Sequence, residues 1–130
     1  MYREVKFRGI SKRTGNWLYG YLTIDKNSAR MEGFPHFISK SSGHLAEEVI
    51  PKSVGQFSGL EDSKGYPIYE GDKFIDVDNN EHIVIFGNGM FGSKIMYELS
   101  DYKTKELIES LHNFVIDGCT IVGNIHNKAY

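Results

Sequence analysis

Cysteine, proline and long apolar runs are scarce in this sequence. Its 130 residues include a single cysteine, Cys119, and three prolines. One cysteine cannot form an intrachain disulfide, and this usage suits a reducing compartment. No segment approaches the roughly 18 consecutive apolar residues of a membrane span, and the charged opening "MYRE" differs from a secretory signal region. We therefore expect a cytoplasmic protein with no membrane partner, in which Cys119 is a buried structural thiol.

Charge is nearly balanced in total but unevenly distributed along the chain. The net charge is −2, which gives no general attraction to nucleic acid or to an anionic membrane. Basic residues crowd the first 30 positions, whereas carboxylates dominate residues 61–90. Two interpretations stay open: two solvated faces, or a basic arm that meets the acidic segment within one chain or between subunits.

Glycine and aromatic residues are plentiful. The chain contains 14 glycines, above the average usage of about 7%, which favours a turn-rich β protein. Aromatic residues make up 13% of the sequence and supply bulky apolar material for a core without disulfides. A chain of this length forms one compact domain or two small β subdomains.

Alternating apolar and polar residues predict strands along most of the chain. Hairpin turns are predicted at Gly15–Asn16 and at Asn79–Asn80, where residue types tolerant of positive φ separate two strands. Both faces of "WLYGYLTI" (17–24) are apolar, so this strand should be central in its sheet or pack against another subunit. Residues 103–114 could form one short helix, and an extended conformation is the alternative.

Several motif-like patterns lack the context that chemistry needs. "GNGMFG" (87–92) has dinucleotide-site spacing, but a β-like segment follows it where a helix is required, so a hairpin loop is predicted. "DVDNNE" (76–81) starts like a calcium loop but lacks its glycine and its final glutamate. The histidines and Cys119 have no zinc-ligand spacing, and "GQFSG" is no nucleophile elbow. We expect no cofactor, no metal and no enzymatic activity.

Two surfaces are candidates for binding. The aromatic residues of the 17–24 strand, Trp17, Tyr19 and Tyr21, are expected to form an oligomer or partner surface, because aromatics concentrate in interface cores. The alternative is a nucleic-acid surface on a β-sheet, with phosphate contacts from the basic residues of the first segment: Arg3, Lys6, Arg8, Lys12 and Arg13.

Three stretches carry a resemblance to a known family. They are the opening "REVKFRGISKRTGNWLYGYL", the central "IPKSVGQFSGLEDSKGYPIYEGDKF" and the terminal "IVGNIHN". Together they resemble the YopX family of small proteins, encoded largely by bacteriophages and prophages. Departures are mild, such as Ser53 and Ser58 where threonine is common, and none removes a turn glycine. Residues 25–48 and 87–118 show no match.

The resemblance implies a fold and a general role. It implies a mainly β fold of two small intertwined subdomains, which we place at 1–53 and 54–130, and assembly as a homo-oligomer. The family's biochemical role is not established, and it offers no catalytic residues to transfer. We therefore expect a non-catalytic protein of a bacterial host's phage or prophage that self-assembles and binds an unidentified host or phage protein.

The glycine-rich central block is expected to be architectural. Its polar groups and glycines are typical turn formers between short strands, and Gly71-Asp72 leads into a strand as at the entrance of a small SH3-like barrel. Ligand or partner binding is the alternative. The residues of this structural turn motif are Gly55, Gln56, Gly59, Asp62, Gly65, Gly71 and Asp72.

Overall fold

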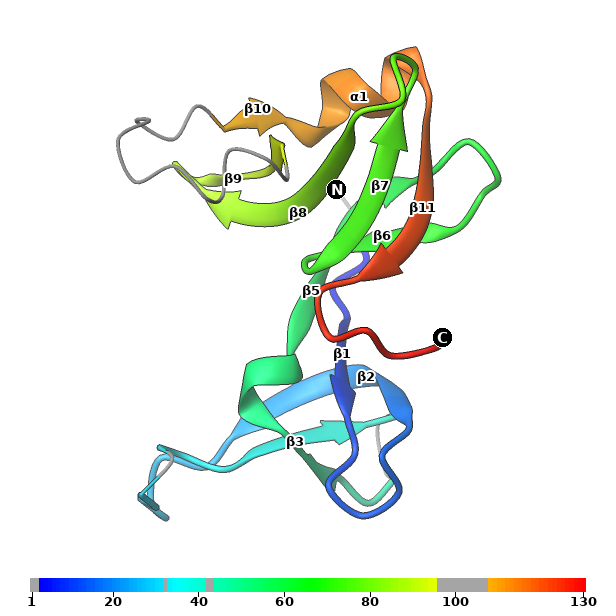
Figure 1. Ribbon diagram of the computed structural model, residues 1–130. Helices are drawn as coiled ribbons and strands as arrows, with labels where there is room; N and C mark the ends of the chain where they lie inside the picture. Colours follow the sequence, from blue (N-terminus) through cyan, green and yellow to red (C-terminus); the bar gives the residue numbers. More distant parts are fainter. Residues whose placement is uncertain (1–2, 32, 42–43, 96–107) are drawn as a thin grey trace. The chain divides into compact units, whose positions relative to one another are not determined.

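The computed structural model describes residues 3–31, 33–41, 44–95 and 108–130 (Figure 1). These residues form two antiparallel sheets and one α-helix, so the prediction of a mainly β fold with little helix is confirmed. The chain divides into two compact units, Met1–Phe57 and Ser58–Tyr130. The division falls inside strand β5 (Gly55–Glu61), a few residues after the position suggested from the sequence.

The first unit is an antiparallel sheet in which β2 is central. Its strand order is β4-β3-β2-β1-β5, and β2 pairs with β1 through its first half and with β3 through its second half. The central position predicted for residues 17–24 is therefore confirmed. The other elements are β1 (Phe7–Ile10), β2 (Trp17–Ile24), β3 (His36–Ser39), β4 (Glu47–Val49) and the 3-10 helix η1 (Pro51–Ser53).

The sheet of the first unit curls around a small core. Ser11, just after β1, forms a bridge with Val49 of β4, so the far edge of β4 is also hydrogen-bonded. Ile38 and Val49 are buried beneath this curl, and a side chain at Gly9 would meet both of them. The predicted hairpin turn lies between β1 and β2, with Gly15 at φ 74°.

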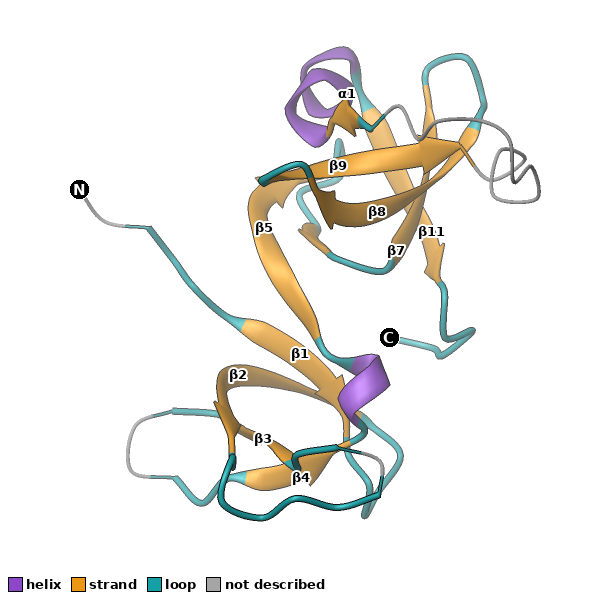
Figure 2. Ribbon diagram, turned by 90° about the vertical axis from the view of Figure 1, so that its left-hand side faces the viewer, coloured by secondary structure: helices purple, strands orange, loops and turns teal. Residues whose placement is uncertain are grey.

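The second unit contains an open sheet of order β10-β9-β8-β7-β11, and β6, which also belongs to this unit, pairs with β5 in the other sheet. Its core contains Ile68, Phe74, Val84, Leu111 and Cys119, which confirms the buried position predicted for the single thiol. The views in Figures 1 and 2 show these strands and α1. The elements are β6 (Pro67–Tyr69), β7 (Asp72–Asp76), β8 (Glu81–Gly87), β9 (Met90–Ile95), β10 (Glu109–Ser110), α1 (Leu111–Asp117) and β11 (Cys119–Asn124).

Residues with positive φ make the tight turns of the second unit. β7 and β8 form the predicted hairpin, and Asn79 has φ 65° in its turn. The "GNGMFG" stretch is the turn between β8 and β9, where Asn88 (φ 52°) and Gly89 (φ 76°) occupy the two central positions. The Asn-Gly pair is the residue type that such a two-residue turn requires. The predicted hairpin loop is confirmed in place of a dinucleotide site.

The sequence left residues 103–114 open between a short helix and an extended segment, and the described part of this range contains both. Residues 109–110 form β10 and α1 begins only at Leu111, whereas residues 103–107 lie outside the described residues. Ile108 does not join a helical face; a side chain added at Gly87 or Gly92 would collide with it. Leu111, Phe114 and Val115 form the apolar stripe of α1 and pack into the core, so tertiary packing decides the start of this helix.

The barrel-like C-terminal part is the incorrect portion of the fold prediction. The described strands form no closed barrel, because β10 and β11 stay at opposite edges of their sheet. The edge of β11 is instead covered by the turn after β5: the Ser63 amide donates to the Cys119 carbonyl, the Cys119 amide donates to the Ser63 hydroxyl, and the Ile121 amide donates to the Asp62 carboxylate. Such a cover protects a sheet edge from unwanted strand pairing. The described part of the chain contains no helix with the length and apolar character needed to cross a bilayer.

Candidate functional site

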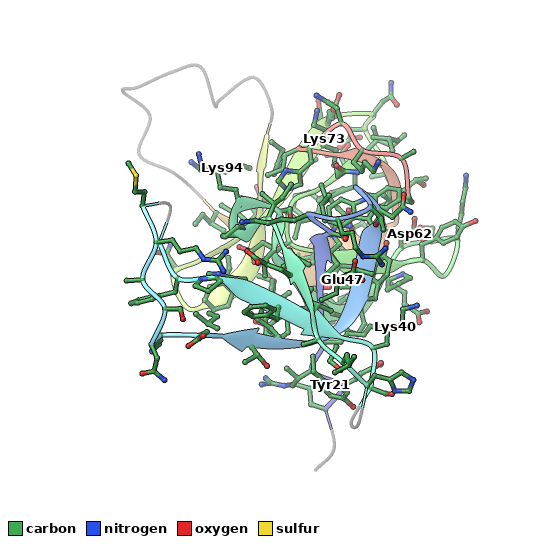
Figure 3. All side chains as sticks on the ribbon, turned by 90° about the horizontal axis from the view of Figure 1, so that it is seen from below. Tyr21, Lys40, Glu47, Asp62, Lys73 and Lys94 are labelled. Atoms are coloured by element: carbon green, nitrogen blue, oxygen red, sulfur yellow. The ribbon has the colours of Figure 1, made fainter. Side chains whose placement is uncertain are left out.

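An open groove of about 430 Å³ lies on the first unit. This volume is within the roughly 300–1,000 Å³ range of binding sites. Tyr19 and Tyr21 are 40% and 58% exposed there, and Figure 3 labels Tyr21 and Lys40. The polar and aromatic side chains that line the groove are Arg3, Glu4, Lys6, Tyr19, Tyr21 and Lys40.

Strand register brings these residues together. Phe7 is paired with Gly20, so the chain that precedes β1 runs on beside Tyr21. Tyr21 is paired with Ser39, which places Lys40 next to the same end of β2. Gly20 lies where β2 changes partner, and a Cβ there would be 2.0 Å from the carbonyl oxygen of Ser39. Glycine is therefore required for this close approach of the two strands.

The groove combines cationic and aromatic groups. Lys6 Nζ lies 3.3 Å from a Glu4 carboxylate oxygen and 4.6 Å from the centre of the Phe57 ring. Arg3 and Lys40 are both exposed at the groove. Three cationic side chains and one carboxylate thus surround two tyrosines, an arrangement that attracts an anionic group and supplies ring faces for packing.

The third predicted interface aromatic, Trp17, has a different environment. The guanidinium carbon of Arg8 lies 4.5 Å from the centre of the Trp17 ring. Arg8 is 1% exposed and Trp17 is partly buried. This pair stacks as a cation–π contact, so Arg8 presents no charge at the surface.

The remaining basic candidates form ion pairs inside the first unit. Lys12 Nζ lies 2.9 Å from Glu48 and Arg13 Nε 3.1 Å from Glu47. Arg30 also pairs with Glu48, at 2.7 Å. Charges of the basic arm therefore meet Glu47 and Glu48, which lie outside the acidic 61–90 segment.

Hydrogen bonds hold both carboxylates in the charged state. The pKa of Glu47 is lowered, chiefly by the hydrogen bond from the Ser11 hydroxyl and further by Arg13. The pKa of Glu48 is lowered chiefly by the hydrogen bond from Lys12. These pairs fix the loop after β1 against β4, and they occupy two of the five cations considered for nucleic-acid contact.

The part of the central block from Ser58 onward forms turns in the second unit. Asp62, 7% exposed, accepts hydrogen bonds at Oδ1 from the amides of Lys64 and Tyr66, each 2.9 Å long. Its Oδ2 accepts the amide of Ile121 at 3.0 Å. One carboxylate thus closes its own turn and attaches that turn to β11, which lies 59 positions further along the chain.

Asp72 performs a similar function at the start of β7. It is 1% exposed, and its carboxylate accepts the Tyr69 amide at 2.8 Å and the Tyr130 hydroxyl. Gly71 donates to Val84 and accepts from Ile125, both at 2.9 Å. The "YEGD" and "GNIHN" stretches, distant in sequence, are therefore hydrogen-bonded in the same unit.

The other members of the turn motif belong to β5 and its turn. Gly55 and Gln56 pair in register with Arg8 and Phe7 of β1. Gly59 lies within β5, and the Gly65 amide donates to the Asp62 carbonyl at 3.0 Å. Every named position of the motif thus lies in a strand or a turn of the described chain.

A serine, a histidine and an aspartate meet in the second unit, and the sequence did not indicate this. His82 Nε2 lies 2.7 Å from Asp76 Oδ2, and Ser93 Oγ lies 3.2 Å from His82 Nδ1. Burial alone would raise the pKa of Asp76, but hydrogen bonds from His82 and from two backbone amides outweigh it and lower that pKa.

The His82 and Ser93 side chains of this arrangement are buried among aromatic rings. His82 and Ser93 are 2% and 3% exposed, and the imidazole is stacked on Phe74 at 4.8 Å and tilted against Phe114 at 4.5 Å. A substrate carbonyl could not reach the serine hydroxyl without opening the core, whereas a nucleophile must be accessible to react. Among the described residues no group of histidine, cysteine and carboxylate side chains has the geometry of a metal site.

Comparison with known proteins identifies the family and supports the fold. Residues 6–129 match the model of the YopX protein family. The chain is also similar to the crystal structure of protein EF1440 from Enterococcus faecalis, with a TM-score of 0.54 and 22% sequence identity over 97% of this chain and 96% of that chain. At this identity the similarity concerns the fold alone. The comparison with curated proteins finds no match.

Proposed function

Because the chain belongs to the YopX family, we propose that it is a non-catalytic protein that self-assembles and acts by binding another protein. The observation that carries this proposal is the groove of the first unit, where exposed Tyr19 and Tyr21 lie beside Arg3, Lys6 and Lys40. Tyrosine gives a large contact area at low conformational cost, and it is enriched in binding surfaces for this reason.

The sheet edges favour a partner that binds through side chains, because they offer little room for an added strand. In the described residues β10 has two residues, β6 has three, and the edge of β11 is covered by the Asp62 turn. Short or covered edges are poor templates for a further strand. The groove therefore offers the better contact surface.

The setting we propose is the cytoplasm of a bacterium that carries a phage or prophage. The family resemblance supports the phage origin, and the buried free thiol of Cys119 is compatible with a reducing compartment.

Two matched tyrosine variants test the role of the groove. Tyr21 is 58% exposed in the groove, and Tyr66 is 60% exposed in the turn after β5. We expect Tyr21→Ala to weaken self-association in sedimentation velocity across a concentration series, and Tyr66→Ala to leave it at the wild-type level. Equal assembly of both variants and the wild-type protein would refute the role of the groove, and a wild-type monomer at all concentrations would refute self-assembly.

Nucleic acid is the second candidate partner, because stacking platforms and cations occur in the same groove. Single strands bind proteins through this combination. The test is fluorescence anisotropy of a labelled single-stranded oligonucleotide. Binding at low salt that weakens steeply with added salt and is lost in Tyr21→Ala would favour this candidate, whereas no binding at low salt would eliminate it.

A further inference from the structure

We propose that the groove of one copy receives the β7–β8 turn of a second copy, residues 76–81. This inference rests on the proposed self-assembly and names the segment that takes part. The turn, with sequence "DVDNNE", contains three carboxylates and no cation. The groove contains three cations and one carboxylate, so the two surfaces are complementary in charge.

The turn is also complementary in its apolar content. Val77 is 66% exposed, although it is a large hydrophobic residue. Asp78 and Glu81 are exposed on either side of the turn. An apolar side chain between carboxylates suits the tyrosine rings and the surrounding cations of the groove, since the rings provide contact area and the cations provide charge pairs.

The turn is rigid before any partner binds. Asp76 Oδ1 accepts the amides of Asp78 and Asn80, each at 2.9 Å. Backbone hydrogen bonds of 3.0 Å join Asp76 to Asn79 and to Asn80, and Asp76 Oδ2 is held by His82. A preorganised loop loses little conformational entropy on binding. The Asp76–His82 pair therefore contributes to the proposed contact by holding the turn in place.

The two surfaces belong to different units of the chain. Each copy therefore offers one groove and one turn. Two copies that exchange turns reciprocally form a two-fold dimer, whereas a head-to-tail contact continues from copy to copy until a ring closes or a filament grows. Assembly is expected to weaken as salt rises, because the attraction includes exposed charge pairs.

Paired charge reversals test this arrangement. The groove variant is Arg3→Glu with Lys40→Glu, and the turn variant is Asp78→Lys with Glu81→Lys; all four residues are exposed. Far-UV circular dichroism and Trp17 fluorescence check that both variants are folded. We expect each variant alone to self-associate about 10- to 100-fold more weakly than the wild-type protein, so that it is monomeric at concentrations where the wild type assembles.

Mixing the two variants distinguishes the possible arrangements. Each variant keeps one native surface, and the reversed groove and the reversed turn are complementary in charge to each other, so an equimolar mixture should associate with 1:1 stoichiometry. Separate variants that assemble as the wild type does would overturn the inference and leave self-assembly intact. Two monomeric variants that do not associate when mixed would also overturn it, whereas a monomeric wild-type protein would refute the proposed self-assembly itself.

Discussion

Replacing Asp62 by alanine tests whether the central block works through its turns. The substitution removes a carboxylate that is 7% exposed and accepts three backbone amides. Two of these amides belong to Lys64 and Tyr66, which are exposed residues of the turn, so water can replace the lost acceptor there. The third belongs to Ile121 of β11, where the loss uncouples the turn from the sheet.

The expected cost follows from these three contacts. A hydrogen bond to a charged group contributes about 1.5–3 kcal/mol, and a buried amide left without an acceptor costs about 1–3 kcal/mol. Because two of the three amides belong to exposed residues, we expect Asp62→Ala to lower the free energy of unfolding of the second unit by roughly 2–4 kcal/mol. Asp62→Asn keeps one acceptor oxygen and should lose about half as much.

Urea unfolding with thiol labelling measures this effect. Cys119 is the single cysteine, it is buried in the second unit, and its amide donates to the neighbouring Ser63. The urea concentration at which Cys119 becomes labelled should fall in Asp62→Ala. Glu61→Ala, which removes an exposed carboxylate from the adjacent position, should stay within about 0.5 kcal/mol of the wild-type protein. A labelling midpoint of Asp62→Ala equal to that of Glu61→Ala would refute the architectural role.

Three further perturbations test other parts of the account. Gly20→Ala places a Cβ 2.0 Å from the Ser39 carbonyl oxygen and should destabilise the first unit by on the order of 1–3 kcal/mol. The unfolding transition followed by Trp17 fluorescence should then occur at a lower urea concentration, and an unchanged transition would contradict the close approach. Burial raises the pKa of Cys119 to about 11. At pH 8 the native protein should therefore react with a thiol reagent far more slowly than the unfolded protein, and equal rates would contradict the burial of Cys119. The pKa of Asp76 is lowered in the folded protein, so its carboxylate stabilises the fold at pH values above its ordinary pKa of about 4. This contribution is lost as the pH falls through the lower, folded-state pKa. Asp76→Asn should therefore make stability fall less steeply with acid, and an unchanged steepness would contradict the lowered pKa.

Local residue chemistry predicted the turns well. Gly15, Asn79 and the Asn88-Gly89 pair were assigned to turns from the sequence, because few residue types accept positive φ, and all four positions have it. The central position of residues 17–24 also followed from their pattern, since both faces are apolar. The turns depend on neighbours in the chain, and the central position follows from the apolar character of both strand faces, so the sequence pattern is sufficient to predict both.

Contacts between distant segments could not be predicted in this way. The hydrogen bond from Ile121 to Asp62 joins residues 59 positions apart, and the meeting of His82 with Ser93 depends on the register between β8 and β9. The sequence left residues 103–114 open between a helix and an extended segment, because Ile108 fits a helical stripe in sequence but lies over glycines of the hairpin in the structure. Tertiary packing, which local patterns do not encode, decided each case.

The candidate site was predicted in part: some of its residues were named from the sequence, but their meeting in one groove was not. Tyr19 and Tyr21 were predicted as an aromatic surface, and Arg3 and Lys6 as a separate basic surface. Pairing of β1 with β2 places parts of both in one groove. Lys40 was missed because its position follows from the register of β3 against β2, and no motif indicates that register.

Hydrogen–deuterium exchange at two protein concentrations shows whether the groove of the first unit is a binding surface. One sample is dilute enough to be monomeric, and the other is concentrated enough to assemble. If the groove binds, exchange should slow on assembly in residues 3–6, in the Tyr19–Tyr21 segment and around Lys40. Slower exchange confined to other parts of the protein, with these segments unchanged, would contradict binding at the groove.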